Sequence, residues 1–180
     1  MDMNALEETA ARFAQDYEQH SHVFATAESC TGGLIGAAIT EIAGSSAWFD
    51  RGFITYTNEA KQQLLGVSEQ VLVQWGAVSV QTACQMVSGA LNHSSADIAV
   101  AVTGIAGPGG GTELKPVGTV CIAFKRRSDD SCHVKCHHFP GNRSEVRKAT
   151  VLEALNGLLT LSSGKSLEGY EQRQTSGEPL

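Results

Sequence analysis

A serine and a cysteine stand side by side where an apolar stretch gives way to a helical pattern. Residues 27–33 read AESCTGG, after the apolar residues 23–25 and before apolar residues at helical spacing from Leu34 to Ile42. The first backbone N–H groups of a helix have no partner within it, and they favour negative charge. A nucleophile at this position would therefore have hydrogen-bond donors for the oxyanion that develops during acyl transfer.

Ser29 is the nucleophile that we predict in this segment. The alternative is that Ser29 only caps the helix, which is the usual role of a serine before a helix. Gly32 and Gly33 favour a functional role, because each costs a helical turn about 1 kcal/mol relative to Ala and so indicates open space for a ligand. Cys30 is the rival nucleophile, since a helix N-terminus can lower the pKa of a thiol. No histidine lies in the surrounding motif to pair with Cys30, and we interpret it as a packing residue.

Lys61 is the candidate base. Asn58 can cap a short helix that ends at Leu65, which places Lys61 in the first turn, where the helix dipole is positive. The same field, together with desolvation, lowers the pKa of a lysine, and a neutral amine can accept a proton from a serine hydroxyl. The alternative is an ordinary solvated lysine. Tyr56, two residues before the proposed cap, either shares the site or is an ordinary strand aromatic.

A glycine-rich loop at residues 103–111 follows an apolar strand at 98–102, and five of its nine residues are glycine. Ligands bind outside the carboxyl ends of strands in open α/β sheets, and glycines let backbone N–H groups approach an anion. Thr103 adds a hydroxyl to the predicted site. The spacing matches neither the nucleoside-triphosphate nor the dinucleotide motif. The alternative is a flexible surface loop.

Two arginines begin the last predicted helix. Arg143 and Arg147 are four residues apart and so share one helix face, where together they could bind a phosphate. The alternative is that both are solvated, with Glu145 nearby.

Residues 132–138 contain two cysteines and three histidines, which is the composition of a metal site. On one strand, however, Cys132 and Cys136 face one side while His133 and His137 face the other. No second pair lies at the spacing of a zinc site. We therefore predict no metal and interpret these side chains as surface residues.

Helices alternate with apolar strands along the chain, which predicts an α/β fold of three layers, with helices on both sides of a mixed sheet. A capping box of Asn142 and Glu145 begins the last helix. The predicted helices are an amphipathic one that opens the chain and residues 33–43, 58–65, 68–74, 80–91 and 142–161; the predicted strands are 22–27, 52–57, 98–102, 117–124 and 132–139. Residues 1–162 are expected to form one domain, and the polar residues 163–180 a mobile tail.

Composition limits the classes of function. The chain has 180 residues, of which 42% are hydrophobic and 18% charged, as in an ordinary globular domain. The formal net charge of −6 argues against a general nucleic-acid-binding protein. No apolar run approaches the ~20 residues that span a bilayer, and the N-terminus does not resemble a signal peptide, so we predict a cytoplasmic protein without a membrane partner. Five cysteines scattered along the sequence favour reduced thiols.

The motifs together resemble the CinA C-terminal domain family over about residues 5–160. The ordered strings that carry the resemblance are AESCTGGLIGAAIT, GSSAWFDRGFITYTNEAKQQLLGV, WGAVS, ADIAVAVTGIAGPGGGTELKPVGTV and FPGNRSEVR. Two positions depart from the usual family pattern: residues 43–46 lack a proline before the glycine, and Thr57 replaces a frequent serine.

The resemblance implies the activity of the family's stand-alone members, which hydrolyse the carboxamide of nicotinamide mononucleotide to nicotinate mononucleotide and ammonia. Ser29, Lys61 and Tyr56 would then be catalytic, with no cofactor and with the nucleotide as the partner. The substrate-binding residues would be Cys30, Thr31, Gly32, Gly33, Ser45, Thr103, Gly104, Arg143 and Arg147. The alternative is a regulatory module that binds a nucleotide without turning it over. A homodimer is compatible with the apolar helices.

Overall fold

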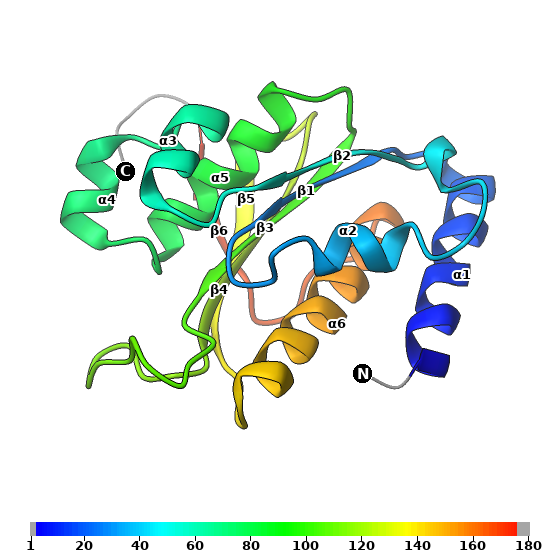
Figure 1. Cartoon of the computed structure of the whole chain (residues 1–180). Coiled ribbons are helices and arrows are strands. Elements are labelled where there is room, and N and C mark those ends of the chain that lie inside the picture. Colours follow the sequence, from blue (N-terminus) through cyan, green and yellow to red (C-terminus); the bar gives the residue numbers. More distant parts are fainter. Residues whose placement is uncertain (1–2, 176–180) are drawn as a thin grey trace.

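The structure, a computed structural model that describes residues 3–175, is built on one six-stranded sheet (Figure 1). The strand order is β2-β1-β3-β4-β5-β6. The strands are β1 (Phe24–Glu28), β2 (Phe49–Ile54), β3 (Ile98–Gly104), β4 (Thr119–Arg126), β5 (Ser131–His138) and β6 (Glu171–Gln174). β1 is parallel to β2 and β3, whereas the β3–β4, β4–β5 and β5–β6 pairs are antiparallel. The predicted α/β fold with a mixed sheet is confirmed.

Helices cover both faces of the sheet and complete three layers (Figure 1). On one face lie α1 (Met3–His20), α2 (Leu34–Ile39) and α6 (Arg143–Ser162); on the other lie α3 (Asn58–Leu65), α4 (Glu69–Trp75) and α5 (Val80–Asn92). Side chains alternate along a strand, so Phe24 packs into the first layer of core while Ala25 and Ala27 pack into the second. β3 is buried from Ile98 to Thr103, as expected for a central strand covered on both faces.

The segment after β1 differs from the predicted helix 33–43. A turn intervenes, and α2 begins only at Leu34 and ends at Ile39. Gly32 and Gly33 precede the helix with φ of 58° and 99°. This is a left-handed conformation that residues with a side chain rarely adopt. A Cβ on Gly33 would also lie 3.1 Å from Cδ1 of Ile54. The two glycines therefore allow the turn itself, rather than leaving open space in a helix.

The other boundaries differ by a few residues. β2 spans 49–54 rather than 52–57, and Thr57, not Asn58, caps α3 by accepting a hydrogen bond from the N–H of Ala60. The capping box of Asn142 and Glu145 at the start of α6 is confirmed. Ser68 caps α4, as predicted, by accepting a hydrogen bond from Val71.

The polar C-terminal stretch is ordered as far as residue 175, which corrects the predicted tail for residues 163–175. β6 pairs with β5 and covers what would otherwise be the edge of the sheet. Tyr170, just before β6, donates a hydrogen bond to Glu153 of α6 (2.9 Å) and packs its ring 5.5 Å from that of Phe124. The Tyr170 side chain and the pairing of β6 with β5 hold this C-terminal segment in place, although its polar composition suggested mobility. The remainder of the predicted tail, residues 176–180, lies outside the described residues.

Four of the five cysteines lie on the side of the sheet that α5 covers, and they form two disulfides. Cys84 of α5 is bonded to Cys132 of β5, and Cys121 of β4 is bonded to Cys136, its direct neighbour across the β4–β5 pair. Cys30 is free and buried. The prediction of five reduced thiols is therefore wrong, because positions far apart in the sequence meet on one face of the sheet. The cytoplasmic location loses this support and stays a prediction.

Candidate active site

A cavity of about 210 Å³ lies at the carboxyl ends of β1 and β3. Parallel neighbours end at the same edge of a sheet, so Ser29 after β1 and Thr103 in β3 meet there. Ser29 continues the sheet pairing, because its N–H donates to the carbonyl of Val102 (3.1 Å). The cavity is lined by Ser29, Cys30, Tyr56, Asn58, Lys61, Ala77, Val78, Thr103, Gly104, Ala106 and Arg143.

The Ser29 hydroxyl meets the side chain of Lys61 in this cavity. The distance from Nζ of Lys61 to Oγ of Ser29 is 3.1 Å, and Nζ also donates to the carbonyl of Thr55 at 2.8 Å. Lys61 is only 1% exposed although it is a lysine on a short surface helix. Strand alternation explains the contact: Glu28 bonds to α2 on one face, and the next residue, Ser29, is directed to α3 on the other.

Burial prepares Lys61 to act as a base. Desolvation lowers the pKa of Lys61 from 10.5 to about 8, so a useful fraction of the amine is neutral near pH 7. A neutral amine within hydrogen-bond distance of a hydroxyl can accept its proton. Desolvation alone accounts for the direction of this shift, and the helix dipole is not needed to explain it.

Cys30 is poorly suited to be the nucleophile. Burial raises the pKa of its thiol to about 11, so the thiol is protonated at neutral pH. Its side chain packs into the core beneath α2 and α6. These properties fit the packing role that the sequence suggested for Cys30.

The backbone donors around the nucleophile are fewer than the sequence suggested. The N–H of Gly32 donates to the carbonyl of Ser29 (3.1 Å), and the N–H of Gly33 donates to Oε1 of Glu28 (3.1 Å). Among the described residues, only the N–H groups of Cys30 and Thr31 in this turn have no acceptor. Cys30 lines the cavity, whereas Thr31 does not and is fully buried, so the candidate oxyanion donor is the N–H of Cys30.

The N-terminus of α2 is not open to a ligand, contrary to the expectation from the sequence. The carboxylate of Glu28 accepts hydrogen bonds from the N–H groups of Ile35 (3.0 Å) and Gly36 (3.0 Å), which are the free donors of the helix. Any oxyanion must therefore be stabilised by the turn before the helix.

Arg143 reaches the cavity from the first turn of α6. Its Nη2 donates to the hydroxyl of Tyr56 (2.8 Å), and its Nη1 donates to the carbonyl of Gly107 in the glycine-rich loop (2.8 Å). Arg143 and Lys61 give the cavity two basic side chains, and none of the described residues that line it is acidic. The cavity is thus suited to an anionic ligand.

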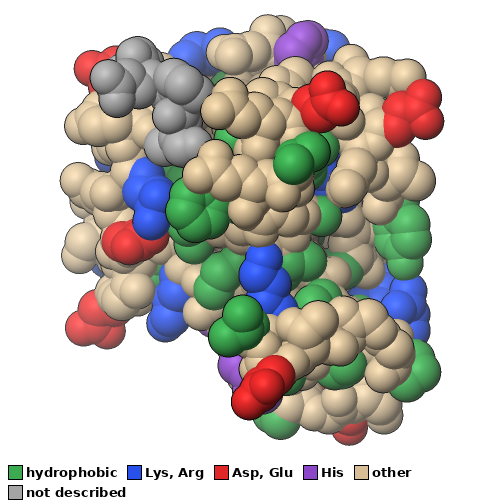
Figure 2. Space-filling model, turned by 90° about the vertical axis from the view of Figure 1, so that its left-hand side faces the viewer, with side chains coloured by type: hydrophobic (Ala, Val, Ile, Leu, Met, Phe, Trp, Pro, Cys, Tyr) green, Lys and Arg blue, Asp and Glu red, His purple; other side chains and the backbone are tan. Residues whose placement is uncertain are grey.

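The face toward which β1 and β3 run is shown in Figure 2. Hydrophobic and basic side chains adjoin there, between the upper part of the molecule and the glycine-rich loop at the bottom. Lys115 of that loop donates a hydrogen bond to the carbonyl of Trp75 at the end of α4 (2.8 Å), which ties the loop to the helical layer.

Comparison with known proteins supports the motif analysis. The sequence matches the model of the CinA C-terminal domain family over residues 6–162. The chain belongs to this family. A nicotinamide-nucleotide amidohydrolase PncC from Enterobacter agglomerans is 54% identical over 133 residues, which are 74% of this chain and 80% of that protein. A CinA-like protein from Geobacter sulfurreducens is 46% identical over 155 residues, but these make up only 36% of that longer protein.

Solved structures of the family share the fold. The competence/damage inducible protein CihA from Agrobacterium tumefaciens superposes with a TM-score of 0.81 at 53% identity, covering 87% of this chain and 94% of that one. The family match ends at residue 162, so the strand β6 lies beyond it.

Thr103 and Gly104, which the resemblance to the CinA family suggested as ligands, both line the cavity, but each also has a structural task. The hydroxyl of Thr103 donates to the carbonyl of Ala77 (2.7 Å) and so is already occupied. A Cβ on Gly104 would lie 2.6 Å from Cγ2 of Val120, so only glycine fits against β4. Of the other residues in the glycine-rich loop 103–111, only Ala106 lines the cavity.

Five other predicted ligands do not line the cavity: the turn residues Thr31, Gly32 and Gly33, and also Arg147 and Ser45. The guanidinium of Arg147 is directed to the nucleophile turn, where its Nε and Nη2 donate to the carbonyls of Cys30 (3.0 Å) and Thr31 (3.1 Å). Ser45 lies in a 3-10 turn at Ser45–Ala47, before β2, and the cavity lies beyond the other end of that strand. The loop that precedes a strand and the loop that follows it lie at opposite ends of that strand. The CinA motif pattern alone does not show at which end each motif lies.

Asn58, Ala77 and Val78 are lining residues that the sequence analysis did not propose, and Ala106 was included only as a member of the loop 103–111. Asn58 had been considered only as a helix cap. The three apolar residues stand inside strings that carry the CinA resemblance, but small apolar side chains have no chemistry by which to single them out.

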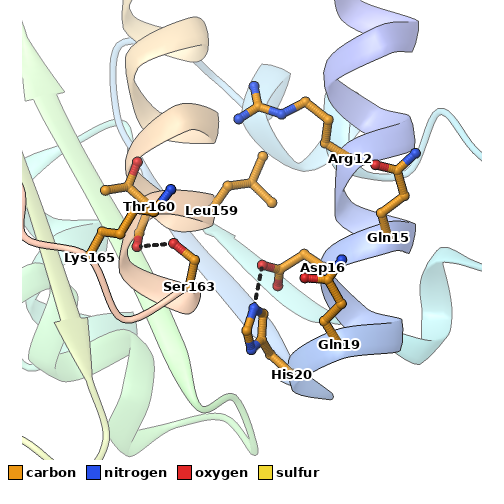
Figure 3. A pocket seen from close by; sticks show the side chains of 9 residues that line it. All are labelled: Arg12, Gln15, Asp16, Gln19, His20, Leu159, Thr160, Ser163 and Lys165. Atoms are coloured by element: carbon orange, nitrogen blue, oxygen red, sulfur yellow. Dashed lines mark hydrogen bonds and ion pairs between the residues drawn. The ribbon is translucent and has the colours of Figure 1, made fainter.

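A second cavity, of about 240 Å³, is lined by residues of α1 and of the C-terminal end of α6 (Figure 3). Its buried carboxylate is already bonded: Asp16 accepts from Ser162 (2.6 Å) and lies 4.0 Å from Nε2 of His20. None of the residues predicted for catalysis or binding lines this cavity. In residues 3–175 no three His, Cys, Asp or Glu side chains are grouped as a metal site would require.

Proposed function

We propose that this protein is a nicotinamide-nucleotide amidohydrolase, which converts nicotinamide mononucleotide and water to nicotinate mononucleotide and ammonia. Relatives from the CinA family that are 53–54% identical bear this name. The observation that carries the proposal is the buried lysine whose Nζ lies 3.1 Å from Oγ of a serine, in a cavity without acidic walls.

The mechanism uses Ser29 as nucleophile and Lys61 as acid and base. Oγ of Ser29 attacks the carboxamide carbon while neutral Lys61 accepts the hydroxyl proton. The N–H group of Cys30 stabilises the negative oxygen of the tetrahedral intermediate. Lys61 returns the proton to the amide nitrogen, the C–N bond breaks, and ammonia leaves an ester on Ser29. Water, deprotonated by Lys61, then attacks the ester and regenerates the serine hydroxyl.

Arg143 is the residue that we assign to the phosphate of the substrate. It lines the cavity and, with Lys61, makes the cavity basic although the whole chain has a formal net charge of −6. Its guanidinium can bind a phosphate with two hydrogen bonds. Tyr56 is placed by Arg143 at the mouth of the cavity, where it can contact the substrate. The route needs no cofactor, because the dyad supplies both nucleophile and base.

The cytoplasmic location remains a prediction, and a homodimer remains compatible with the apolar helices. Within residues 3–175 no helix is both long enough and apolar enough to span a bilayer.

The direct test is an assay of ammonia and nicotinate mononucleotide with the purified chain and its variants. We expect Ser29→Ala and Lys61→Met to lower kcat by about a thousandfold or more, because each removes a member of the dyad. Lys148→Ala, which removes an exposed lysine elsewhere on the surface, is the matched control and should keep full turnover. Near-parental turnover in either dyad variant would contradict the mechanism. Tight binding of the mononucleotide with no product from the parent chain would instead indicate a regulatory binding module.

A further inference from the structure

We propose that Glu28 and Arg147 are positioning residues, which hold the turn at residues 29–33 so that the N–H group of Cys30 stays free and directed to the oxyanion. The inference rests on the proposed function, because it assigns roles in the same acyl transfer. Neither residue lines the cavity, so neither would touch the substrate.

Glu28 organises the turn from the side of α2. It is 1% exposed, and its two carboxylate oxygens accept five hydrogen bonds, from the hydroxyls of Thr26 and Thr31 and from the N–H groups of Gly33, Ile35 and Gly36. All five donors are neutral, and four of them lie on the turn or on the first residues of α2. A buried carboxylate is costly unless its oxygens are satisfied, so this set of donors fixes the path of the chain.

Arg147 holds the same turn from the side of α6. Its Nε donates to the carbonyl of Cys30 at 3.0 Å and its Nη2 to the carbonyl of Thr31 at 3.1 Å. The planar guanidinium binds each carbonyl through a separate nitrogen in a fixed geometry, whereas a lysine offers a single ammonium on a flexible stem. Arg147 does not line the cavity, so it is not placed to be the phosphate ligand that the sequence suggested.

The planarity of the peptide bond links these contacts to the chemistry. In a trans peptide, the carbonyl and the N–H of the same group point in opposite directions. The free N–H of Thr31 shares its peptide group with the carbonyl of Cys30, which Arg147 binds. The free N–H of Cys30 shares its group with the carbonyl of Ser29, which the N–H of Gly32 binds. The N–H of Cys30, the candidate oxyanion donor, is therefore oriented through the carbonyl of Ser29, and Arg147 fixes the next peptide group of the turn through the carbonyl of Cys30.

Glu28 acts indirectly on the peptide group that joins Ser29 and Cys30. It binds the N–H of Gly33 and the hydroxyl of Thr31, and so holds the residues on both sides of Gly32. Preorganised donors contribute to catalysis because no reorientation is needed when the charge develops. Loosening the turn should therefore slow the chemical step and leave ground-state binding of the nucleotide nearly unchanged.

The test compares Arg147→Ala, Arg147→Lys and Glu28→Gln with the parent chain by two readouts. The first is the split between kcat and KM for nicotinamide mononucleotide. The second is the rate at which a fluorophosphonate labels Ser29: Oγ bonds to phosphorus, fluoride leaves, and Lys61 takes the hydroxyl proton. This reagent carries no nucleotide phosphate, yet its phosphoryl oxygen requires the same donor.

We expect Arg147→Ala and Glu28→Gln to lower both kcat and the labelling rate by about 10- to 100-fold, with KM within about threefold of the parent value. Gln replaces one accepting oxygen with a donor, so at least one N–H of the turn loses its partner. Arg147→Lys should give a smaller loss than Arg147→Ala. The exposed neighbour variant Lys148→Ala should change neither readout.

An increase of KM of more than tenfold with unchanged kcat and labelling in Arg147→Ala would overturn the inference and make Arg147 a phosphate ligand. Unchanged labelling in the folded Arg147 variants would overturn it as well, and Arg147 carries the test if Glu28→Gln does not fold. Failure of the proposed function looks different. In that case the parent chain releases no ammonia from the mononucleotide, while labelling of Ser29 still reports whether Arg147 and Glu28 position the turn.

Discussion

At the scale of single residues, burial determines what Lys61 can do. A solvated lysine at neutral pH is almost fully protonated and cannot accept a proton, but Lys61 is 1% exposed and its pKa is lowered to about 8. Its two hydrogen-bond partners are a serine hydroxyl and a backbone carbonyl. In the proposed mechanism, the neutral amine beside the hydroxyl activates Ser29 as the nucleophile, since a serine alone is a weak one.

The pH dependence of the reaction follows from this shift. Lys61 must be neutral to accept the proton of Ser29, so kcat should rise about tenfold per pH unit below pH 8 and level off above it. At pH 7 roughly one tenth of the enzyme is in the active form. Initial rates at saturating mononucleotide between pH 6.5 and 9.5 measure this profile. A profile that is flat across that range, or that falls with pH, would exclude Lys61 as the base.

The sequence indicated the proposed nucleophile and base, Ser29 and Lys61, but it did not indicate the residues that hold the turn around Ser29. Ser29 and Lys61 could be proposed because their types have chemistry and their neighbours suggested helix starts. Glu28 stands next to the nucleophile, yet its role depends on where the chain folds back after Gly33, which no local pattern shows. Arg147 was assigned to a phosphate because its spacing from Arg143 was known, whereas the partner of each guanidinium was not.

At the scale of elements, the strands and long helices were predictable and the connections were not. α5 and β3 carry strong periodic or continuous apolar patterns and appear within two residues of their expected bounds. The turn before α2 requires left-handed glycines and a buried carboxylate, and these features are set by tertiary contacts. The C-terminal strand was missed because its four residues, EQRQ, are polar and because its anchor, Tyr170, is a single aromatic residue.

The anchor of β6 can be tested by two substitutions of Tyr170. Its hydroxyl accepts a hydrogen bond from Nε2 of His137 and donates one to Glu153, and its ring packs on Phe124. We expect Tyr170→Ala to lower the free energy of unfolding by about 2–4 kcal/mol through lost packing. Tyr170→Phe, which keeps the ring, should cost only about 1 kcal/mol. Chemical denaturation measures both.

Catalysis provides the control for that experiment. Tyr170 lies against β5 and α6, away from the residues that line the cavity, so kcat at 25 °C should remain unchanged in both variants. Equal destabilisation by Phe and Ala would show that the hydroxyl, not the ring, holds the strand. A loss of kcat in a folded variant would show that β6 communicates with the site.

At the scale of the whole molecule, the fold brings together groups from distant parts of the chain. The nucleophile follows β1, the base comes from α3 on one face of the sheet, and Arg143 comes from α6 on the other (Figure 1). The α/β class and the mixed sheet could be predicted from alternating helices and strands. The strand order could not be predicted from the sequence. For the same reason, the sequence did not reveal that Ser45 lies at the opposite end of β2 from the cavity, or that four cysteines from distant positions form disulfides.

The same topology gives the site a charge opposite to that of the molecule. A chain with a formal net charge of −6 has a cavity whose charged lining residues, as far as the structure describes them, are Lys61 and Arg143. The cavity is therefore suited to an anionic ligand, which the overall composition alone would not suggest.

The central claim is that the pyridine carbonyl becomes esterified to Ser29 before water reaches it. Hydroxylamine tests this most directly, because it competes with water for an acyl-enzyme and yields a hydroxamate. With nicotinamide mononucleotide as substrate, we expect the share of hydroxamate mononucleotide to rise with hydroxylamine concentration while ammonia release does not fall. If ammonia and nicotinate mononucleotide still form in equal amounts, with no hydroxamate at any hydroxylamine concentration that leaves the enzyme active, water attacks the amide directly and the account is contradicted.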